Sequence, residues 1–353
     1  MKIKAIEYEL HNLKLSEPYQ IAYETVDSCQ NITLKVITDT GLVGYGIAAP
    51  DWEVTGEYSE DVISMVKDVM QPMLLGEDPL QRTRWMDELK QTTQVGSSAR
   101  AMLDLALHDL LGKYAKLPLY KLLGGYKNSI PTSITIGIKP IEETIETAKR
   151  YLRSGFTVIK LKGGIDIEED IEKVHLLREQ CGDDFLLRFD ANQGYTPEEA
   201  LTFIRKTDNC AIEIMEQPTH KNSLRAMKVV TDGSDIPVMA DESITSLKDA
   251  IKLTRNEAMD MINIKLQKVG GILEAEHINS VGKSSGLEVM VGCLDECSLG
   301  IAAGLHFALS RPNIQYADLD GHLDIINDPY EGLFEIKNGV MIPNQQYGLG
   351  LSI

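Results

Sequence analysis

The fold is decided by residues 157–192, TVIKLKGGIDIEEDIEKVHLLREQCGDDFLLRFDAN. Thr157–Leu161 and Phe185–Phe189 are short apolar runs of the kind that form buried strands, and Ile167–Cys181 between them has the apolar spacing of a helix. A strand, a helix and a second strand in this order predict a βαβ unit, in which the two strands run parallel.

The same alternation continues on both sides of this unit. Further short strands are expected at 133–138, 212–215, 238–240, 261–266, 288–292 and 315–318. Together with the first two they make eight parallel strands alternating with helices, which is the number that closes a barrel. We therefore predict an α/β fold with a (β/α)-barrel catalytic domain over residues 126–320.

The chain before the barrel has a different pattern. The first ~30 residues alternate, Asn31–Thr38 and Leu42–Ile47 follow as strands around a turn, and helical spacing then dominates, as in Ala99–Lys113. Strands followed by helices predict an α+β module over residues 1–125. The remaining residues, 321–353, are expected to pack back on this module.

Composition narrows the classes of partner. The 353 residues carry a formal net charge of -18, which argues against nucleic acid and against anionic membranes. The five cysteines include no CxxC pair, so a disulfide framework or structural zinc is not expected. The first residues lack an apolar signal core, and no apolar run approaches the roughly 18 residues of a membrane span. We expect a cytoplasmic enzyme, with a homo-oligomer possible.

Charged residues stand at the ends of the predicted barrel strands. Lys162, Asp190, Glu216, Asp241 and Lys265 follow one another at steps of 28, 26, 25 and 24 residues, each about one strand and helix. They should therefore recur at the same level of consecutive strands, whose carboxyl ends converge on one site in a barrel.

The residue types indicate the chemistry of that site. Asp190, Glu216 and Asp241 form an oxygen-only set that suits a hard cation such as Mg²⁺. Lysines approach from both sides: Lys160 and Lys162 share one strand face, and Lys265 lies on another strand. Two such bases allow a proton to leave one face of a carbon and return on the other. Alternatively each group is a solvated loop residue or a surface pair, but their regular spacing favours a site.

At these residues the chain resembles the enolase superfamily, in the muconate-lactonising-enzyme subgroup. The matching motifs are Lys160-Leu161-Lys162, Asp190-Ala191-Asn192, Glu216-Gln217-Pro218, Asp241-Glu242-Ser243 and Asn263-Ile264-Lys265. The resemblance implies a capping domain over the barrel and Mg²⁺ bound by the three acids. It also implies that Lys162 and Lys265 are the opposed acid and base, and that Lys160 holds the substrate carboxylate.

A second lysine competes for one of these roles. Lys265-Leu266-Gln267-Lys268 contains two candidates, of which Lys265 lies within the predicted strand. Lys268 falls beside Gly270-Gly271, where a turn is expected, and we predict that it is solvated.

Within the subgroup, Asp318-Leu319-Asp320 resembles the Asp-x-Asp motif with which dipeptide epimerases bind the substrate's α-ammonium group. Two carboxylates on one strand face are a sound site for a cation. The alternative is an acidic turn leading into Gly321. Thr135 corresponds to a substrate-contacting threonine of the family, or else packs within its strand.

Acidic residues near the predicted site indicate the charge of the substrate side chain. Epimerases that act on Ala-Glu carry an arginine near residue 24, where this chain has Glu24. Asp51 and Asp295 instead resemble the epimerases that prefer lysine- or arginine-containing dipeptides, and Cys293 is expected to line the pocket. Asp51 and Glu24 are otherwise solvated loop residues.

The combined hypothesis is a Mg²⁺-dependent isomerase, a dipeptide epimerase acting through an enediolate. An o-succinylbenzoate synthase or a cycloisomerase of the same superfamily is the alternative reaction, because the same lysines and metal would serve it. A non-catalytic, metal-stabilised binding barrel is the alternative without chemistry.

Overall fold

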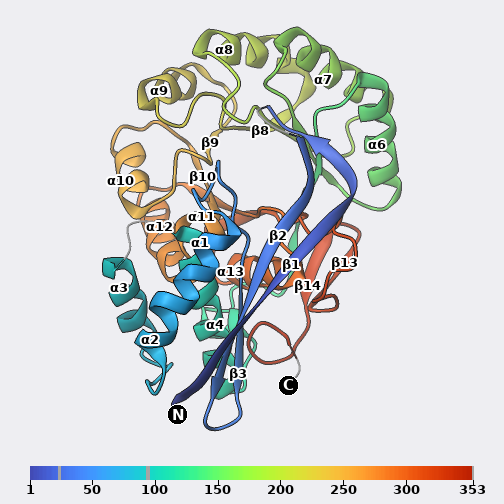
Figure 1. Cartoon of the computed structure of the whole chain (residues 1–353). Coiled ribbons are helices and arrows are strands. Elements are labelled where there is room, and N and C mark those ends of the chain that lie inside the picture. The colour runs from blue at the N-terminus through green and yellow to red at the C-terminus, as the bar shows by residue number, and fades with distance from the viewer. Residues whose placement is uncertain (23–24, 93–95, 352–353) are drawn as a thin grey trace.

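The centre of the protein is an eight-stranded parallel sheet curved into a barrel, as the computed structural model of residues 1–22, 25–92 and 96–351 shows (Figure 1). Its strands are neighbours in chain order: β5 (Ile134–Ile136), β6 (Val158–Lys162), β7 (Leu186–Asp190), β8 (Ile212–Glu216), β9 (Val238–Ala240), β10 (Met261–Lys265), β11 (Glu288–Gly292) and β12 (Ile314–Asp318). A parallel bridge between Thr132 and Ala317 joins the two ends of the sheet. The predicted (β/α)-barrel is confirmed.

Helices surround the barrel: α6 (Ile141–Arg153), α7 (Ile167–Cys181), α8 (Pro197–Lys206), α9 (Leu224–Gly233), α10 (Leu247–Arg255), α11 (Leu266–Val269), α12 (Ile272–Ser284) and α13 (Ser298–Ala308). Local sequence sets where they begin. The Asp166 carboxylate accepts two backbone N–H bonds at the start of α7, and Thr196 and Glu199 form a capping box at α8. Phe189 on β7 packs on Phe203 of α8, with ring centroids 4.2 Å apart. Within the described ranges, no helix has the length and apolarity needed to cross a membrane.

The N-terminal domain combines a sheet with helices. Its antiparallel strands are β1 (Ile3–Gln20), β2 (Thr25–Thr38) and β3 (Val43–Ala48). Its helical part comprises α1 (Ser59–Met65), a π-helical segment (Val66–Met70), α2 (Gln71–Leu74), α3 (Arg82–Thr92), α4 (Ser97–Ala115) and α5 (Leu119–Leu122). A Cβ at Gly46 of β3 would lie 1.9 Å from the Met102 carbonyl oxygen of α4, so glycine there lets the helix lie directly on the sheet.

The N-terminal domain contacts the barrel at both ends of its sheet. The ribbon of β1 and β2 crosses toward α6 (Figure 1), where Lys139 Nζ lies 2.6 Å from Glu17 Oε1. At β3, the buried Gln267 side chain accepts from Ala49 N at 3.2 Å and donates to the Ile47 carbonyl at 3.1 Å. These contacts hold the sheet beside the carboxyl ends of the barrel strands.

The segment after residue 320 contacts both domains. Its strands β13 (Phe334–Lys337) and β14 (Val340–Pro343) form a small antiparallel sheet with β4 (Ile130–Pro131), which precedes the barrel strands. Against the N-terminal domain, Ser16 N donates to the Asp324 carbonyl at 2.7 Å, and Leu349 N donates to Asp109 Oδ1 at 2.8 Å.

Candidate active site

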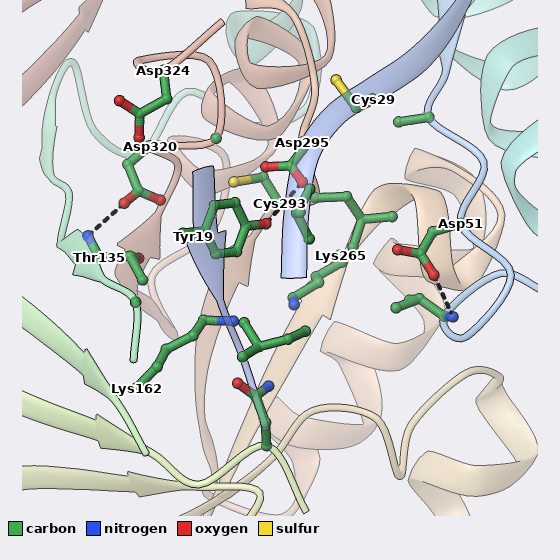
Figure 2. A pocket seen from close by; sticks show the side chains of 18 of the residues that line it. Tyr19, Cys29, Asp51, Thr135, Lys162, Lys265, Cys293, Asp295, Asp320 and Asp324 are labelled. Atoms are coloured by element: carbon green, nitrogen blue, oxygen red, sulfur yellow. Dashed lines mark hydrogen bonds between the residues drawn. The ribbon is translucent and has the colours of Figure 1, made fainter. Parts of the chain in front are cut away.

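A cavity of about 310 Å³ lies where the carboxyl ends of the barrel strands meet the N-terminal domain (Figure 2). Nine of the predicted site residues line it: Asp51, Thr135, Lys160, Lys162, Lys265, Cys293, Asp295, Asp318 and Asp320. The three predicted metal ligands Asp190, Glu216 and Asp241 are 0–1% exposed and contact the lysines of this cavity. Glu24, the remaining predicted residue, lies outside the described residues.

Strand register brings these residues to one level of the barrel. Lys162 stands opposite Asp190, and Asp190 stands opposite Glu216. Lys265 and Asp318 both stand opposite the same residue of β11. The spacing in the sequence predicted this common level, because one strand and one helix separate each residue from the next.

Lys160 is the centre of an acidic cluster. Its Nζ lies 2.8 Å from Glu216 Oε2, 2.8 Å from Asp318 Oδ2 and 3.1 Å from Asp190 Oδ2, and its side chain is 2% exposed. Burial disfavours the ammonium form, but the carboxylates outweigh it and raise the pKa of Lys160 well above its ordinary value. Lys160 is therefore a fixed cation that holds these acids together.

Asp241 has two lysine partners. Lys265 Nζ lies 2.9 Å from Asp241 Oδ2, whereas Lys268 Nζ donates to Asp241 Oδ1 and to the Asp241 carbonyl. Our prediction that Lys268 is solvated is wrong, since it is 1% exposed. The reason is that α11 follows β10 without a loop, and this helical turn directs the Lys268 side chain toward the Asn263 carbonyl, at 3.2 Å.

Lys162 and Lys265 come from opposite walls of the barrel. They end β6 and β10, which are four strands apart in a closed sheet of eight. Figure 2 shows their side chains extending from two sides toward the same space. Lys162 is the less tightly paired of the two, with its Nζ 4.0 Å from Asp190 Oδ2.

The buried acids fit a hard divalent cation. Asp190 Oδ2 and Asp241 Oδ2 accept no hydrogen bond despite their burial, and burial raises the pKa of Glu216 to about 8. No three acidic, histidine or cysteine side chains in the described chain have the spacing of a formed metal site. Lys160 lies between Asp190 and Glu216 instead, and Lys265 lies beside Asp241. The donor set, three carboxylates, is of the kind that Mg²⁺ prefers.

A buried glutamine, whose contacts the sequence did not reveal, ties two of the strand ends together. Gln217 Oε1 accepts from Asp241 N at 2.9 Å, and its Nε2 donates to Ser243 Oγ at 2.8 Å. Gln217 and Asn192 have φ of 33° and 42°, in the left-handed region that costs energy for residues other than glycine. Strained backbone of this kind gathers at functional sites.

Asp318 and Asp320 lie at one end of the cavity with Thr135. Asp318 Oδ1 accepts from Ser133 Oγ at 2.6 Å, and Asp320 Oδ2 accepts from Thr135 N at 2.6 Å. Burial, and next the charge of Asp318, raise the pKa of Asp320 to about 7. Because Lys160 already pairs with Asp318, Asp320 is the carboxyl group with capacity for a further cation.

Asp295 and Asp51 lie on the side of the N-terminal domain. The Tyr19 hydroxyl donates to Asp295 Oδ2 at 2.8 Å, and burial raises the pKa of Asp295 to about 6 (Figure 2). Asp51 Oδ1 accepts from Val54 N at 2.9 Å, so Asp51 also shapes its own loop. Cys293 lines the same part of the cavity.

Two further buried acids were missed from the sequence. Glu242 lines the cavity with its Oε2 unbonded, and burial raises its pKa. Glu296 accepts from Gln267 Nε2 at 2.9 Å, and burial raises its pKa to about 7. Each directly follows a predicted site residue, Asp241 or Asp295, and that position was the available signal.

The fold and this arrangement of lysines and acids define the class. Residues 143–353 match the family described as enolase C-terminal domain-like, and residues 5–124 match the mandelate racemase / muconate lactonizing enzyme N-terminal domain. The chain therefore belongs to the mandelate racemase and muconate lactonizing enzyme family of the enolase superfamily, as its motifs predicted.

Among its relatives, the chain is 36% identical to the L-Ala-D/L-Glu epimerase of Bacillus subtilis, over 99% of this chain and 97% of the relative. It is 38% identical to the L-Lys-D/L-Arg epimerase of Desulforapulum autotrophicum, over 99% of each. The crystal structure of the Enterococcus faecalis dipeptide epimerase, complexed with Mg and the dipeptide L-Leu-L-Tyr, is 35% identical with a TM-score of 0.96 over 100% of both chains. The structural similarity thus extends over both domains.

Proposed function

We propose that this protein is a Mg²⁺-dependent dipeptide epimerase, which inverts the α-carbon of the C-terminal residue of a small dipeptide. The observation that carries the proposal is the approach of Lys162 and Lys265 to one cavity from opposite barrel walls. Amines on two faces of an α-carbon can remove its proton on one side and return it on the other. The activities named for the relatives support this reaction class.

Asp190, Glu216 and Asp241 are the residues that would hold Mg²⁺. When bound, the ion supplies a Lewis acid for the substrate carboxylate and the enediolate, and its charge lowers the pKa of nearby lysines. The burial of the three acids at the ends of consecutive strands supports this assignment. So does the Mg in the complex of the Enterococcus faecalis relative.

Lys162 and Lys265 differ from Lys160 in the number of carboxylates that contact each ammonium group. A general base must be neutral when it accepts a proton. Burial lowers the pKa of Lys265, but Asp241 at 2.9 Å outweighs it and keeps the lysine charged. Lys265 can act as a general base once another cation takes its place beside Asp241 Oδ2. Lys160 contacts three carboxylates and keeps its proton, which suits a residue that binds the substrate carboxylate.

The acids at the two ends of the cavity would orient the dipeptide. Asp320, supported by Asp318 and Thr135, is placed to receive the N-terminal ammonium group. The C-terminal α-carbon then falls between Lys162 and Lys265. The N-terminal domain covers this position and limits the access of water, which strengthens the electrostatic contacts.

We also propose a preference for lysine or arginine side chains. Asp295 and Asp51 supply negative charge near the reacting centre, and Asp324 also lines the cavity. Relatives with cationic, acidic and apolar preferences are similarly identical to this chain, so overall similarity does not decide the matter. The acidic lining is what favours a cationic side chain.

Isotope exchange tests the two-base proposal. Dipeptides are incubated with the enzyme and Mg²⁺ in D₂O, and α-deuterium incorporation is followed by mass spectrometry for each epimer separately. Wild type should label both epimers. Lys162→Ala and Lys265→Ala should each abolish epimerisation, by about a thousandfold or more, because each removes one of two obligatory groups. Each variant keeps one lysine, so any remaining α-deuterium exchange should label only one epimer. The epimer labelled by Lys162→Ala should be the one that Lys265→Ala does not label.

Lys173→Ala is the matched control, because Lys173 is 2% exposed and paired with Glu169 on α7, away from the cavity. It should keep both exchanges. Retained epimerisation in Lys265→Ala would refute the assigned role. Labelling of no dipeptide, with turnover of succinylbenzoate precursors or muconate, would assign the barrel to the other reactions. If the protein had neither of these activities, the remaining alternative would be a non-catalytic binding barrel.

A further inference from the structure

Lys268 is a buried cation whose contacts all go to the framework of the site. Its Nζ donates to Asp241 Oδ1, to the Asp241 carbonyl and to the Asn263 carbonyl, the last at 3.2 Å. An ammonium group has three N–H donors, and these acceptors use all three. Lys268 is 1% exposed and its contacts are all internal, which suits a structural group rather than an acid or base for a substrate.

These contacts decide which Asp241 oxygen is available. Lys268 binds Oδ1 and, through the two carbonyls, ties it to the end of β9 and to β10. Asp241 Oδ2 accepts no hydrogen bond and faces Lys265, which lines the cavity. Asp241 therefore turns one oxygen toward Lys265 and the cavity side, and it cannot rotate to turn both that way without breaking its bond to Lys268.

We propose that Lys268 is a positioning residue that restricts Asp241 to single-oxygen coordination and so makes the site selective for Mg²⁺ over Ca²⁺. The inference rests on the metal site of the proposed function. Mg²⁺ requires near-octahedral geometry at about 2.0–2.1 Å, whereas Ca²⁺ accepts six to eight oxygens and often takes both oxygens of a carboxylate. A carboxylate held by one oxygen suits the smaller ion.

The ratio of the two affinities is the quantity to measure. Replacing Lys268 by an uncharged residue removes a positive charge beside the site, and this favours both divalent ions alike. Only the release of Asp241 Oδ1 discriminates between them. A change in the Mg²⁺ to Ca²⁺ ratio therefore reports positioning, which a general loss of stability would not produce.

The experiment uses isothermal titration of the full chain with Mg²⁺ and with Ca²⁺, for wild type and for Lys268→Met. We expect the ratio of affinities to shift toward Ca²⁺ by roughly tenfold or more, the usual effect of losing a residue that orients a metal ligand. Lys268→Gln is the second variant and decides the question if the methionine variant does not fold. Its shorter amide reaches fewer of the three acceptors, so a shift in the same direction is expected.

Lys113→Met is the control, because Lys113 repeats this chemistry in the N-terminal domain. It is buried, with its Nζ 2.7 Å from Asp109 Oδ2 and 2.9 Å from the Val43 carbonyl. It should leave the ratio unchanged. An unchanged ratio in the folded Lys268 variants, or an equal shift in Lys113→Met, would overturn the inference. A wild-type chain that binds no Mg²⁺ would instead refute the metal site itself.

Discussion

The ionised carboxylate of Asp320 should lower the stability of the fold and favour binding of a cationic ligand. Asp320→Asn, which cannot ionise, tests both effects. Asp320 is half-buried near Asp318, and its pKa in the folded protein is raised from an ordinary 3.8 to about 7. Thr135 N donates to one of its oxygens at 2.6 Å, which asparagine can still accept. The variant therefore keeps the hydrogen bond from Thr135 N and removes the negative charge that would bind a cation.

The sign of the stability effect follows from proton counting. Between pH 4 and 7 the folded state binds more protons at Asp320 than the unfolded state, so unfolding free energy falls as pH rises through this range. The pKa difference of about 3 corresponds to a ceiling of about 4 kcal/mol. Relaxation and solvent access reduce it, and we expect Asp320→Asn to be more stable than wild type at pH 8 by about 1–3 kcal/mol.

Urea unfolding midpoints between pH 4 and 9 provide the measurement. The difference between wild type and Asp320→Asn should grow from about pH 4 and level off above about pH 7. Asp295→Asn is the control: it removes an acid whose pKa is about 6, so its own difference should already level off above about pH 6. A parallel offset at all pH values would show that Asp320 is ionised normally.

Binding should show the opposite effect. A dipeptide ending in α-aminoisobutyrate has no α-hydrogen to remove and reports binding alone. Its affinity for wild type should rise through pH 7 as Asp320 ionises, and fall above about 8 as its own amine loses its proton. Asp320→Asn should bind it about 10- to 100-fold more weakly and lack the rise. Equal affinity in the variant would refute the placement of the ammonium group.

Two further changes test other parts of the site. Asp295→Asn should lower kcat/KM for lysine- or arginine-containing dipeptides by about 10- to 100-fold, the loss expected for one charge-assisted contact, and leave Ala-Ala nearly unaffected; equal losses for both would remove the basis for a cationic preference. Gln217→Ala should destabilise the chain by about 2–3 kcal/mol in urea, since it leaves Asp241 N and Ser243 without their buried partner. Gln193→Ala, whose amide lies 3.3 Å from Glu242 in a partly buried position, should cost less.

The barrel could be predicted because its strands carry their own signal. Each is a short apolar run, and in most of them a charged residue at or just after the strand end also marks the site. The long ribbon was harder: β1 runs to Gln20 and β2 already begins at Thr25, before the apolar stretch at Asn31. Those residues pair across the ribbon with exposed polar side chains, so composition gives little sign of a strand.

Contacts between distant residues were beyond the sequence. Tyr19 meets Asp295 across the domain boundary, and Ser133 meets Asp318 across the closure of the barrel. Neither hydroxyl differs in the sequence from others that face solvent. Spacing could assign both acids to the site, but it could not show which donor would reach them.

Lys265 and Lys268 illustrate that strand position could be predicted from the sequence, whereas the burial of a side chain beyond the strand could not. Lys265 ends β10 and Lys268 lies in the helical turn that follows, yet both contact Asp241. The sequence correctly placed Lys265 within its strand, yet it predicted that Lys268 is solvated, because Gly270-Gly271 indicated a turn. The helical turn of α11 instead sends Lys268 inward, and a buried ammonium group requires buried acceptors. The two lysines, three residues apart, therefore contact different parts of Asp241: Lys265 lies beside Oδ2 and lines the cavity, whereas Lys268 donates to Oδ1 and to the backbone carbonyl.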